Sequence, residues 1–406
     1  MSDDQMDYNS DAGPELVAAR IKTFFDRAPC YKWEGQIGRG ANGAVYKFIR
    51  STGTRYRRLA VKICPLDVDL GGYKSYDEED EDIPDELQSL MNEKVWLHRL
   101  RNGLHIIKSL DLPNDPLDPL NATHPGVWPH RMRSWIFMEL AENGGLETFV
   151  GRHQTQYDGQ ALPNRLLWRL FMCLVRACLE MAYYNASLDG RPVDPKTASL
   201  ATLNRIQPGD LAHMDLGQQN VVLGATALDA STEHNVTPIL KVIDFGEALM
   251  VDAAHEMYHQ SGSDVNVRQI CEVMVYVVLQ RREDFNNVIV TFPNVGTFET
   301  RASPIVDNYH DLQAAGVDDD LLLLLCKGTS MDLNVRPGLL ELAYIVADRV
   351  MNRGDNGVQR ETDQDIKLRV SSIINDGVTE PRKRKWEGDH YSDGGSPPRR
   401  RRGVVV

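Results

Sequence analysis

Several features that mark particular protein classes are missing from this chain of 406 residues. Its six cysteines are scattered and form no C-x-x-C pair, a pattern that indicates reduced thiols rather than a disulfide framework or a zinc site built from paired cysteines. No apolar run approaches the ~20 residues that span a bilayer, so no membrane association is expected. The first residues, Met1 to Asp7, are acidic, and we therefore expect neither a secretory signal nor a transit peptide.

Charge is unevenly distributed along the chain, whose net charge is −13. Residues 382–402 contain eight basic and three acidic residues, a local charge of +5, so the remainder carries −18 (−13 minus 5). An acidic body disfavours non-specific binding to nucleic acid, which makes nucleic acid an unlikely partner. The basic end of the chain needs a separate explanation.

Five short elements follow one another in a fixed order: a glycine-rich turn, a lysine in a strand-like run, a glutamate, an H-x-D-x-x-x-x-N string and a D-F-G. Together they provide the parts that phosphoryl transfer from ATP requires, namely a cover for the phosphates, a cation, a base and two metal ligands. They are Gly38-x-Gly40-x-x-Gly43-x-Val45, Lys62 in Ala-Val-Lys-Ile, Glu93, His213-x-Asp215-x-x-x-x-Asn220 and Asp244-Phe245-Gly246.

The order of these elements resembles that in the protein-kinase family. The residues around the last two elements are most similar to those of divergent fungal Ser/Thr kinases. The resemblance covers residues 31–350. It implies an α+β, bilobal protein-kinase-like fold with a small antiparallel β-rich N-lobe and a larger helical C-lobe, and it implies ATP and Mg²⁺ as cofactors and a protein as substrate. We expect residues 1–30 to be an N-terminal segment, partly disordered, and residues 351–380 to be a linker or tail.

The glycine-rich turn is a weak signal by itself, because dinucleotide-binding folds and ordinary turns share it. In a dinucleotide fold a helix would begin directly after the turn, whereas here strand-like runs lie on both sides. Two interpretations remain: a loop that covers phosphates, with Ile37 and Val45 over the adenine, and a plain hairpin. The resemblance also places the backbone of Glu139 to Ala141 at the adenine edge.

A helix is expected at about 85–101, and on it three leucines lie within about 60° of Glu93. A glutamate on an apolar face is costly unless a cation or hydrogen bonds satisfy it. Lys62, presented from an alternating strand, is the expected partner, and by the resemblance it would hold the α- and β-phosphates. The alternatives are a lysine on the solvent face of its strand and a helix-edge glutamate that reaches water.

The H-x-D string is the most specific signal in the chain. By the resemblance, Asp215 accepts or orients the proton of the attacking hydroxyl, and Asn220 and Asp244 coordinate Mg²⁺ through side-chain oxygens. His213 is expected to pack and hydrogen-bond rather than to act as an acid or base. The alternative, an Asp and an Asn that merely cap a turn, would not explain why a D-F-G follows after another strand-like run.

Departures from the family pattern are also present. Gly217 stands where Ser/Thr kinases usually carry a lysine that neutralises the γ-phosphate, Asn266 stands where a tryptophan is usual, and the short stretch after the D-F-G has no A-P-E. The expected function is an ATP-dependent protein kinase directed at Ser or Thr. Two alternatives are kept: a pseudokinase or scaffold that binds ATP with little turnover, and a small-molecule kinase with a related core.

The last part of the chain, residues 381–406, is expected to be a disordered basic tail. Its two basic clusters, 382–385 and 399–402, flank a spacer of thirteen residues (386–398). Two such clusters on a polar spacer resemble a bipartite nuclear localisation signal, which implies importin as a partner and a location in the nucleus, the cytoplasm or both. The alternative is a basic tail that associates with nucleic acid or with the acidic body.

Overall fold

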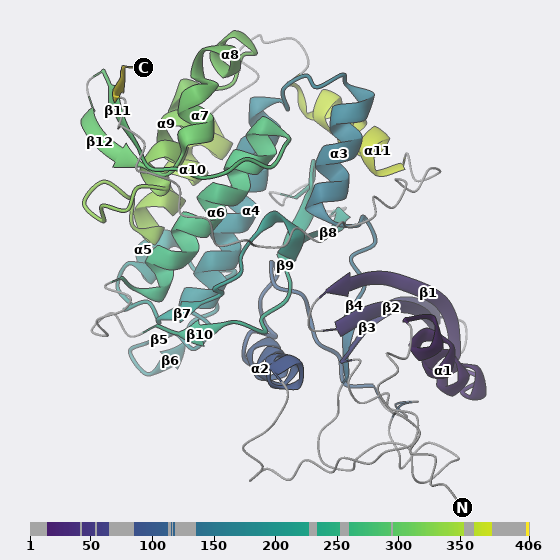
Figure 1. Cartoon of the computed structure of the whole chain (residues 1–406). Helices are drawn as coiled ribbons and strands as arrows, with labels where there is room; N and C mark the ends of the chain where they lie inside the picture. Colours follow the sequence, from purple (N-terminus) through teal and green to yellow (C-terminus); the bar gives the residue numbers. More distant parts are fainter. Residues whose placement is uncertain are drawn as a thin grey trace, which may run out of the picture. The chain divides into compact units, whose positions relative to one another are not determined.

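The chain folds into an α+β structure with a small antiparallel sheet in its N-terminal region and a mostly helical remainder (Figure 1). The computed structural model describes residues 14–40, 43–52, 55–64, 85–112, 115, 117, 135–226, 234–251, 260–293, 295–352, 361–375 and 403–405. Residues 1–13 and both basic clusters of the predicted nuclear localisation signal lie outside this described part.

The described residues divide into two compact units. Unit 1 takes its residues from Met1–Arg101, Ile107–Leu140 and Asp244–Ala248. Unit 2 takes its residues from Asn102–Ile106, Ala141–Ile243 and Leu249–Val406. The D-F-G segment therefore belongs to unit 1, whereas the H-x-D string belongs to unit 2.

The sheet of unit 1 has four antiparallel strands in the order β1-β2-β3-β4. The β2 strand alternates, so that Tyr46 and Phe48 are buried while Val45 and Lys47 are partly exposed, as expected for a sheet with one covered face. The four strands are β1 (Tyr31–Gly40), β2 (Gly43–Thr52), β3 (Arg55–Ile63) and β4 (Trp135–Glu139).

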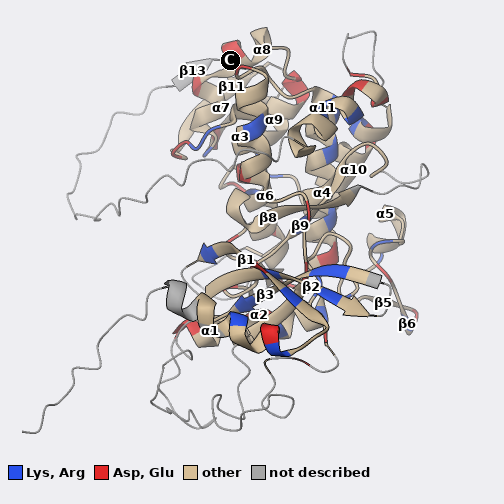
Figure 2. Ribbon diagram, turned by 90° about the vertical axis from the view of Figure 1, so that its right-hand side faces the viewer, with Lys and Arg blue, Asp and Glu red and all other residues tan. Residues whose placement is uncertain are grey.

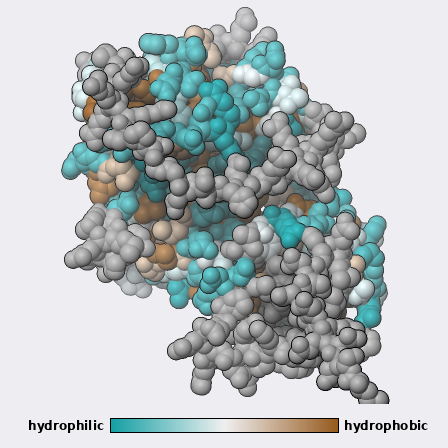
Figure 3. All heavy atoms as spheres, viewed as in Figure 1, coloured by the Kyte–Doolittle hydropathy of each residue, from teal (hydrophilic) through white to brown (hydrophobic). Residues whose placement is uncertain are grey.

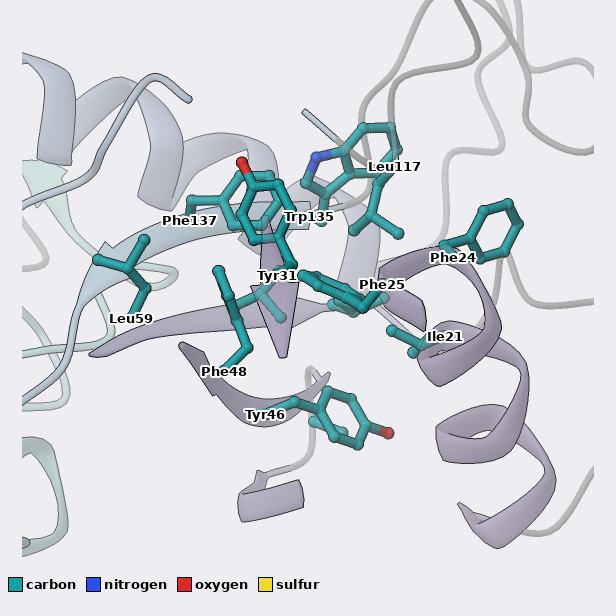
Figure 4. Packing of buried hydrophobic residues seen from close by; sticks show 13 residues of the cluster. Ile21, Phe24, Phe25, Tyr31, Tyr46, Phe48, Leu59, Leu117, Trp135 and Phe137 are labelled. Carbon is teal, nitrogen blue, oxygen red and sulfur yellow. The ribbon is translucent and has the colours of Figure 1, made fainter. Parts of the chain in front are cut away.

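An aromatic cluster joins helix α1 (Pro14–Arg27) to this sheet, and Figure 4 shows its rings converging from the helix and several strands. Phe25 of α1 lies with its ring centroid 4.8 Å from that of Phe48, and Phe48 lies 5.7 Å from Phe137 of β4 in an edge-to-face arrangement. Aromatic pairs at these separations add to the stabilisation from burial. The N-terminal helix is thus part of the core of unit 1.

Helix α2 (Asp85–Arg99) forms where the sequence predicts it. Asp85 and Glu86 lie in its first turn and His98 and Arg99 in its last, which is the charge order that the helix dipole favours. Its buried residues include the expected leucines together with Glu93.

Unit 2 is built around helix α4 (Asn164–Ala182), which is buried on nearly all sides. Its apolar residues are buried and its three arginines are partly exposed, and α4 packs against α6, α10 and strand β9. The helices of unit 2 are α3 (Leu146–Gln156), α4, α5 (Leu200–Leu203), α6 (Gly262–Leu279), α7 (Ser303–Asp307), α8 (Tyr309–Ala314), α9 (Asp319–Gly328), α10 (Leu339–Asn352) and α11 (Asp363–Asn375), with the 3-10 turn η2 (Gln218–Asn220).

Short strand pairs complete unit 2. Two of them flank the H-x-D string. Strand β7 directly precedes the string and pairs with β10, and strand β8 directly follows it and pairs with β9. The strands are β5 (Ser187–Leu188), β6 (Arg191–Pro192), β7 (Leu211–Ala212), β8 (Val221–Thr226), β9 (Pro238–Val242), β10 (Leu249–Met250), β11 (Val288–Phe292), β12 (Gly296–Thr300) and β13 (Gly403–Val405), the last parallel to β11.

Helix α11 lies within the segment 351–380 that the sequence suggested as a linker or tail. Its residues Ile366, Val370 and Ile373 are buried, and the Arg369 guanidinium lies 4.2 Å from the ring centroid of Tyr157, next to the end of α3. Contacts of this kind between a cation and an aromatic face are attractive. The helix is accordingly packed onto unit 2.

The described surface is mixed in polarity. On the face drawn in Figure 3, hydrophilic side chains surround smaller apolar areas, and the exposed large apolar residues, such as Met250, Met331 and Leu368, are spread along the chain. Among the described residues, no helix has the length and apolar character needed to cross a bilayer.

Candidate functional site

A buried ion-pair cluster forms in unit 1 around Lys62. Its Nζ donates to Glu93 Oε2 at 2.6 Å and to Asp244 Oδ1 at 2.7 Å. The side chains of Lys62 and Glu93 are only 8% and 1% exposed, whereas that of Asp244 is 36% exposed. Two other basic residues of β3, Arg57 and Arg58, are exposed; Figure 2 shows where basic and acidic positions lie along the ribbon. Among the basic side chains of β3 whose burial is described, Lys62 is the buried one, and the contact expected with Glu93 is formed.

The electrostatics of the cluster follow from this burial. Burial by itself lowers the pKa of Lys62, but the opposite charges of Glu93 and Asp244 outweigh it, so the pKa is raised and the ammonium is retained. Burial raises the pKa of Glu93, and the nearby Asp244 charge adds to the rise while Lys62 opposes it. With both carboxylates ionised the cluster carries a net charge of −1, and Asp244 is its solvent-accessible member.

The D-F-G segment is fastened to helix α2. Asn92 Nδ2 donates to the carbonyls of Gly246 at 2.7 Å and Ala248 at 2.8 Å. A Cβ added at Gly246 would lie 2.0 Å from the Ser89 hydroxyl oxygen, so only glycine fits there. Asp244 itself adopts a left-handed backbone conformation with φ of +65°, which is uncommon for a residue other than glycine. Strain of this kind is concentrated at functional sites.

The glycine-rich turn joins β1 to β2 as an antiparallel hairpin, with Gly38 opposite Val45 and Gly40 opposite Gly43. A Cβ at Gly43 would lie 2.7 Å from the carbonyl oxygen of Ile63, so this position requires glycine for close packing against β3. Added Cβ atoms at Gly38 and Gly40 would meet no such obstruction. The hairpin itself fits both interpretations of the turn, while Gly38 and Gly40 leave the open backbone that a phosphate cover needs.

Further along unit 1, β4 ends at Glu139. Its backbone N–H donates to the Lys108 carbonyl at 3.0 Å, and its Oε1 accepts from the Lys108 N–H, also at 3.0 Å. These bonds occupy the amide of Glu139. Ala141, the other residue expected at the adenine edge, belongs to unit 2, where its carbonyl accepts from the Gly144 N–H at 3.3 Å.

The H-x-D string forms a compact loop in unit 2. Asp215 is exposed, and Asn220 Nδ2 donates to its Oδ2 at 2.8 Å and to its backbone carbonyl at 2.7 Å. Both amide hydrogens of Asn220 are used in this way, which leaves its Oδ1 as the atom that could ligate a cation. The two predicted side chains are thus brought together, with the carboxylate of Asp215 facing solvent.

Three residues that fix this loop are His213, Asn266 and Gln269. His213 is fully buried and its Nε2 donates to the Ile243 carbonyl at 3.0 Å, which ties the H-x-D string to the residue before the D-F-G. Asn266 Oδ1 accepts from the His213 N–H at 2.9 Å while its Nδ2 donates to the Leu211 carbonyl at 2.8 Å. The sequence pattern marked Asn266 only as a departure, yet it is completely buried and bridges the loop.

The loop also carries backbone strain next to the predicted base. Met214 has φ of +68°, and its carbonyl accepts from Gln269 Nε2 at 2.8 Å. A left-handed conformation at a methionine persists only where its surroundings enforce it. The hydrogen bond from Gln269 provides that enforcement from α6, so Asp215 is presented by a loop held in a single conformation.

The space beside Gly217 is taken by the side chain of Gln219. A Cβ added there would lie 2.5 Å from the side-chain amide of Gln219, so this amide occupies the room where a side chain at Gly217 would begin. Gln219 Nε2 is 3.5 Å from Asp215 Oδ1, a distance too long for a strong hydrogen bond. An amide donor therefore lies beside Asp215.

A pocket of about 420 Å³ adjoins the same loop in unit 2. Leu216, Gly217 and Gln218, which follow Asp215 directly, form one wall, and the opposite walls come from α6 and from the segment after it. Its lining mixes acidic and basic side chains with aromatic ones, including Glu272, Arg281, Asp284 and Tyr276. Burial raises the pKa of Tyr276 to about 12, so it stays a neutral phenol. The volume is within the usual range of small-ligand sites.

The structure brings the predicted residues together in two groups. Lys62, Glu93 and Asp244 are in contact in unit 1, and Asp215 and Asn220 are in contact in unit 2. Comparison of the chain with protein-family models and with curated proteins finds no match.

Proposed function

We propose that this chain is an ATP-dependent protein kinase of Ser/Thr type, with a bilobal kinase-like fold whose lobes correspond to the two units. The observation that carries the proposal is the Lys62 ammonium held between Glu93 and Asp244 at 2.6 and 2.7 Å. Burying an ammonium between one buried and one accessible carboxylate costs desolvation free energy, and apolar side chains could fill the same space without that cost. It suits an enzyme that must aim one cation at phosphate oxygens.

The predicted metal ligands are of the kind that Mg²⁺ prefers. Magnesium prefers carboxylate and carbonyl oxygens and is bound with few protein ligands, leaving positions for phosphates and water. Asp244 offers a carboxylate that is 36% exposed, and Asn220 offers its Oδ1 because Asp215 takes both amide hydrogens. Bound Mg-ATP would supply the transferable phosphoryl group and the metal that neutralises its charge.

The chain's own residues would divide the remaining work. Lys62 binds phosphate oxygens, and Glu93 keeps its ammonium aimed and charged. The β1–β2 turn covers the phosphates with backbone amides, which Gly38 and Gly40 leave unobstructed. Asp215 accepts the proton of the attacking hydroxyl, and Asn220 fixes its carboxylate. Gln219 donates to the transferring group in place of the usual lysine.

A pseudokinase is the second candidate, and Gly217 is the observation that favours it. An amide donor is neutral, so Gln219 would stabilise the charge of the transition state less than a lysine would. A chain of this kind would bind ATP through Lys62 and turn it over slowly. The two candidates differ in rate rather than in ATP binding.

The test is phosphate transfer from radiolabelled ATP by the purified full chain to a mixture of protein acceptors. The wild type is compared with Asp215→Asn and with the control Asp189→Asn, whose side chain is 81% exposed on the surface of unit 2. We expect Asp215→Asn to lose about 10²–10⁴-fold in rate while ATP binding persists, and Asp189→Asn to behave as wild type. Retained turnover in Asp215→Asn would remove Asp215 as the base. Wild-type binding without transfer would favour the pseudokinase, and label on a small molecule would change the substrate class.

A further inference from the structure

Three buried side chains with metal-ligating atoms meet in unit 2, and none of them is a predicted site residue. His105 comes from the short segment 102–106, Cys173 from the middle of α4, and His234 from the turn before β9. One ligand atom from each lies within 4.8 Å of the other two. The exposed fractions are 2%, 1% and 4%. Two imidazoles and a thiol therefore share one site inside the core.

The distances within this cluster are close to those between the ligands of a single ion. His105 Nε2 lies 3.2 Å from His234 Nε2, and Cys173 Sγ lies 3.7 Å from His234 Nδ1, the other nitrogen of the same ring. Two nitrogens bound tetrahedrally to one zinc ion, each at about 2.0–2.1 Å, lie about 3.4 Å apart. His234 can offer only one of its two nitrogens to an ion, and with one ligand atom from each residue the three atoms lie within 4.8 Å of one another. A sulfur and a nitrogen bound to one zinc ion lie about 3.5 Å apart, so the Cys173 thiolate would have to move closer by up to about 1.3 Å.

A carboxylate prepares His105 for such a role. Glu180 of α4 accepts from His105 Nδ1 at 3.0 Å and from the backbone N–H groups of Leu104 and His105 at 2.9 and 2.8 Å. The ring therefore carries its proton on Nδ1, and the lone pair on Nε2 points toward His234 and Cys173. Carboxylates placed behind a ligating histidine orient its ring and strengthen it as a ligand.

The segment that carries His105 is also held by shape and by hydrogen bonding. A Cβ at Gly103 would lie 2.7 Å from Glu180 Oε2, so glycine is required for the carboxylate to approach. Lys241, which is buried, donates from its Nζ to the Leu104 carbonyl at 2.8 Å. The ring of His105 is thus fixed by packing from two sides, as a rigid metal site requires.

The chemistry of the ligand atoms decides which ion fits. Glu180 and Lys241, which both hydrogen-bond to the backbone of Leu104, contribute opposite charges. A thiolate at Cys173 would then be an uncompensated anion in the core, and a cation bound to its sulfur neutralises it. Nitrogen and sulfur ligands select zinc-class ions over magnesium or calcium. We propose that His105, Cys173 and His234 bind one zinc-class divalent cation, with Glu180 behind His105.

The competing arrangement holds no metal. In it a chain of hydrogen bonds runs from Glu180 through the two imidazoles to the thiol of Cys173, and every donor faces an acceptor. The two arrangements differ in metal content and in the state of the sulfur. An ion in this closed site would bind as the chain folds and would join three segments that are distant in sequence.

The test measures zinc in the purified full chain, expressed with zinc present, by elemental mass spectrometry. We expect about one zinc per chain, falling at least about tenfold in His234→Asn and in Cys173→Ser. Cys178→Ser is the matched control, since Cys178 lies on the same helix and is equally buried, and it should keep its zinc. Glu180→Gln should weaken binding by about 10–100-fold in competition with a chelator.

A second measurement needs no variant to fold. The wild-type chain is stripped of metal, refolded with CoCl₂ and examined for the absorption band of a thiolate bound to cobalt. That band is expected, and it should be absent from Cys173→Ser wherever this variant folds. Less than about 0.1 zinc per chain together with no thiolate band would overturn the proposal and leave the hydrogen-bonded chain. Zinc retained in both ligand variants would also overturn it, because the ion would then lie elsewhere.

Discussion

Replacing Glu93 with glutamine removes the buried charge opposite the Lys62 ammonium with almost no change in side-chain size. Breaking a buried ion pair from one side costs about 3–5 kcal/mol, because the remaining charge stays in a poorly solvated place. Asp244 accepts from Lys62 at 2.7 Å, and the substitution does not remove this bond, so we expect part of the attraction to remain. We therefore expect the free energy of unfolding of unit 1 to fall by about 2–3 kcal/mol.

The double variant Lys62→Met/Glu93→Leu separates charge from packing. It removes both buried charges and leaves Asp244, whose side chain is 36% exposed and can be solvated. Apolar replacement of a buried pair is often neutral or stabilising. The double variant should therefore be more stable than Glu93→Gln alone, although by the proposed function it would lose phosphate transfer.

Hydrogen–deuterium exchange of peptides from β3 and α2 is the appropriate assay, since a chain with two compact units need not unfold in one step. Glu86→Gln, in the first turn of α2, is the matched control and should change stability by no more than about 0.5 kcal/mol. Two outcomes would refute the reasoning: a Glu93→Gln chain as stable as the control, or a double variant less stable than the single one.

Two further predictions concern unit 2. Gln219→Ala should lower the rate of phosphate transfer by about 10–100-fold, which is the contribution of one hydrogen bond to a charged group. The control Gln218→Ala should change this rate little. Equal rates in the two variants would exclude Gln219 as the donor that replaces the lysine. Burial lowers the pKa of His153, and Arg369 lowers it further. Its neutral form stabilises the fold above pH 6.5, and this stability is lost as the pH falls through the lower folded-state pKa. His153→Phe should therefore lose less stability than the wild type between about pH 7.5 and pH 5 in urea denaturation, and an equal loss would contradict this.

The sequence predicts those parts of the molecule that depend on the spacing of residues within one helix or strand. Apolar residues at three- and four-residue steps predict a helix over 165–183, and α4 spans Asn164–Ala182. Glu93 lies among leucines on one face of its helix, so its charge needs a cation as partner. The alternation of side chains along β3 places Lys62 on the inner face, where it provides this cation. In both cases the period of one element decides which face is buried.

The sequence does not predict the sites that form where segments distant along the chain meet in the folded structure. His105 and Cys173 are 68 positions apart (173 − 105), and Cys173 and His234 are 61 apart (234 − 173), so no spacing rule links them. The role of Asn266 depends on the loop folding against α6, which a residue-by-residue comparison with a family pattern cannot show. The left-handed backbone of Asp244 is likewise not predicted by the residue type alone, because most aspartates do not adopt it.

The packing of α11 determines where the chain can be shortened. A fragment that stopped at residue 350 would lack the buried side chains of Ile366, Val370 and Ile373, and it would leave the Tyr157 ring without its guanidinium partner. Fragments prepared for crystallisation or enzymology should extend at least to Asn375. A cut directly after Asn375 keeps α11 but removes β13 (Gly403–Val405), so it leaves β11 without its parallel partner.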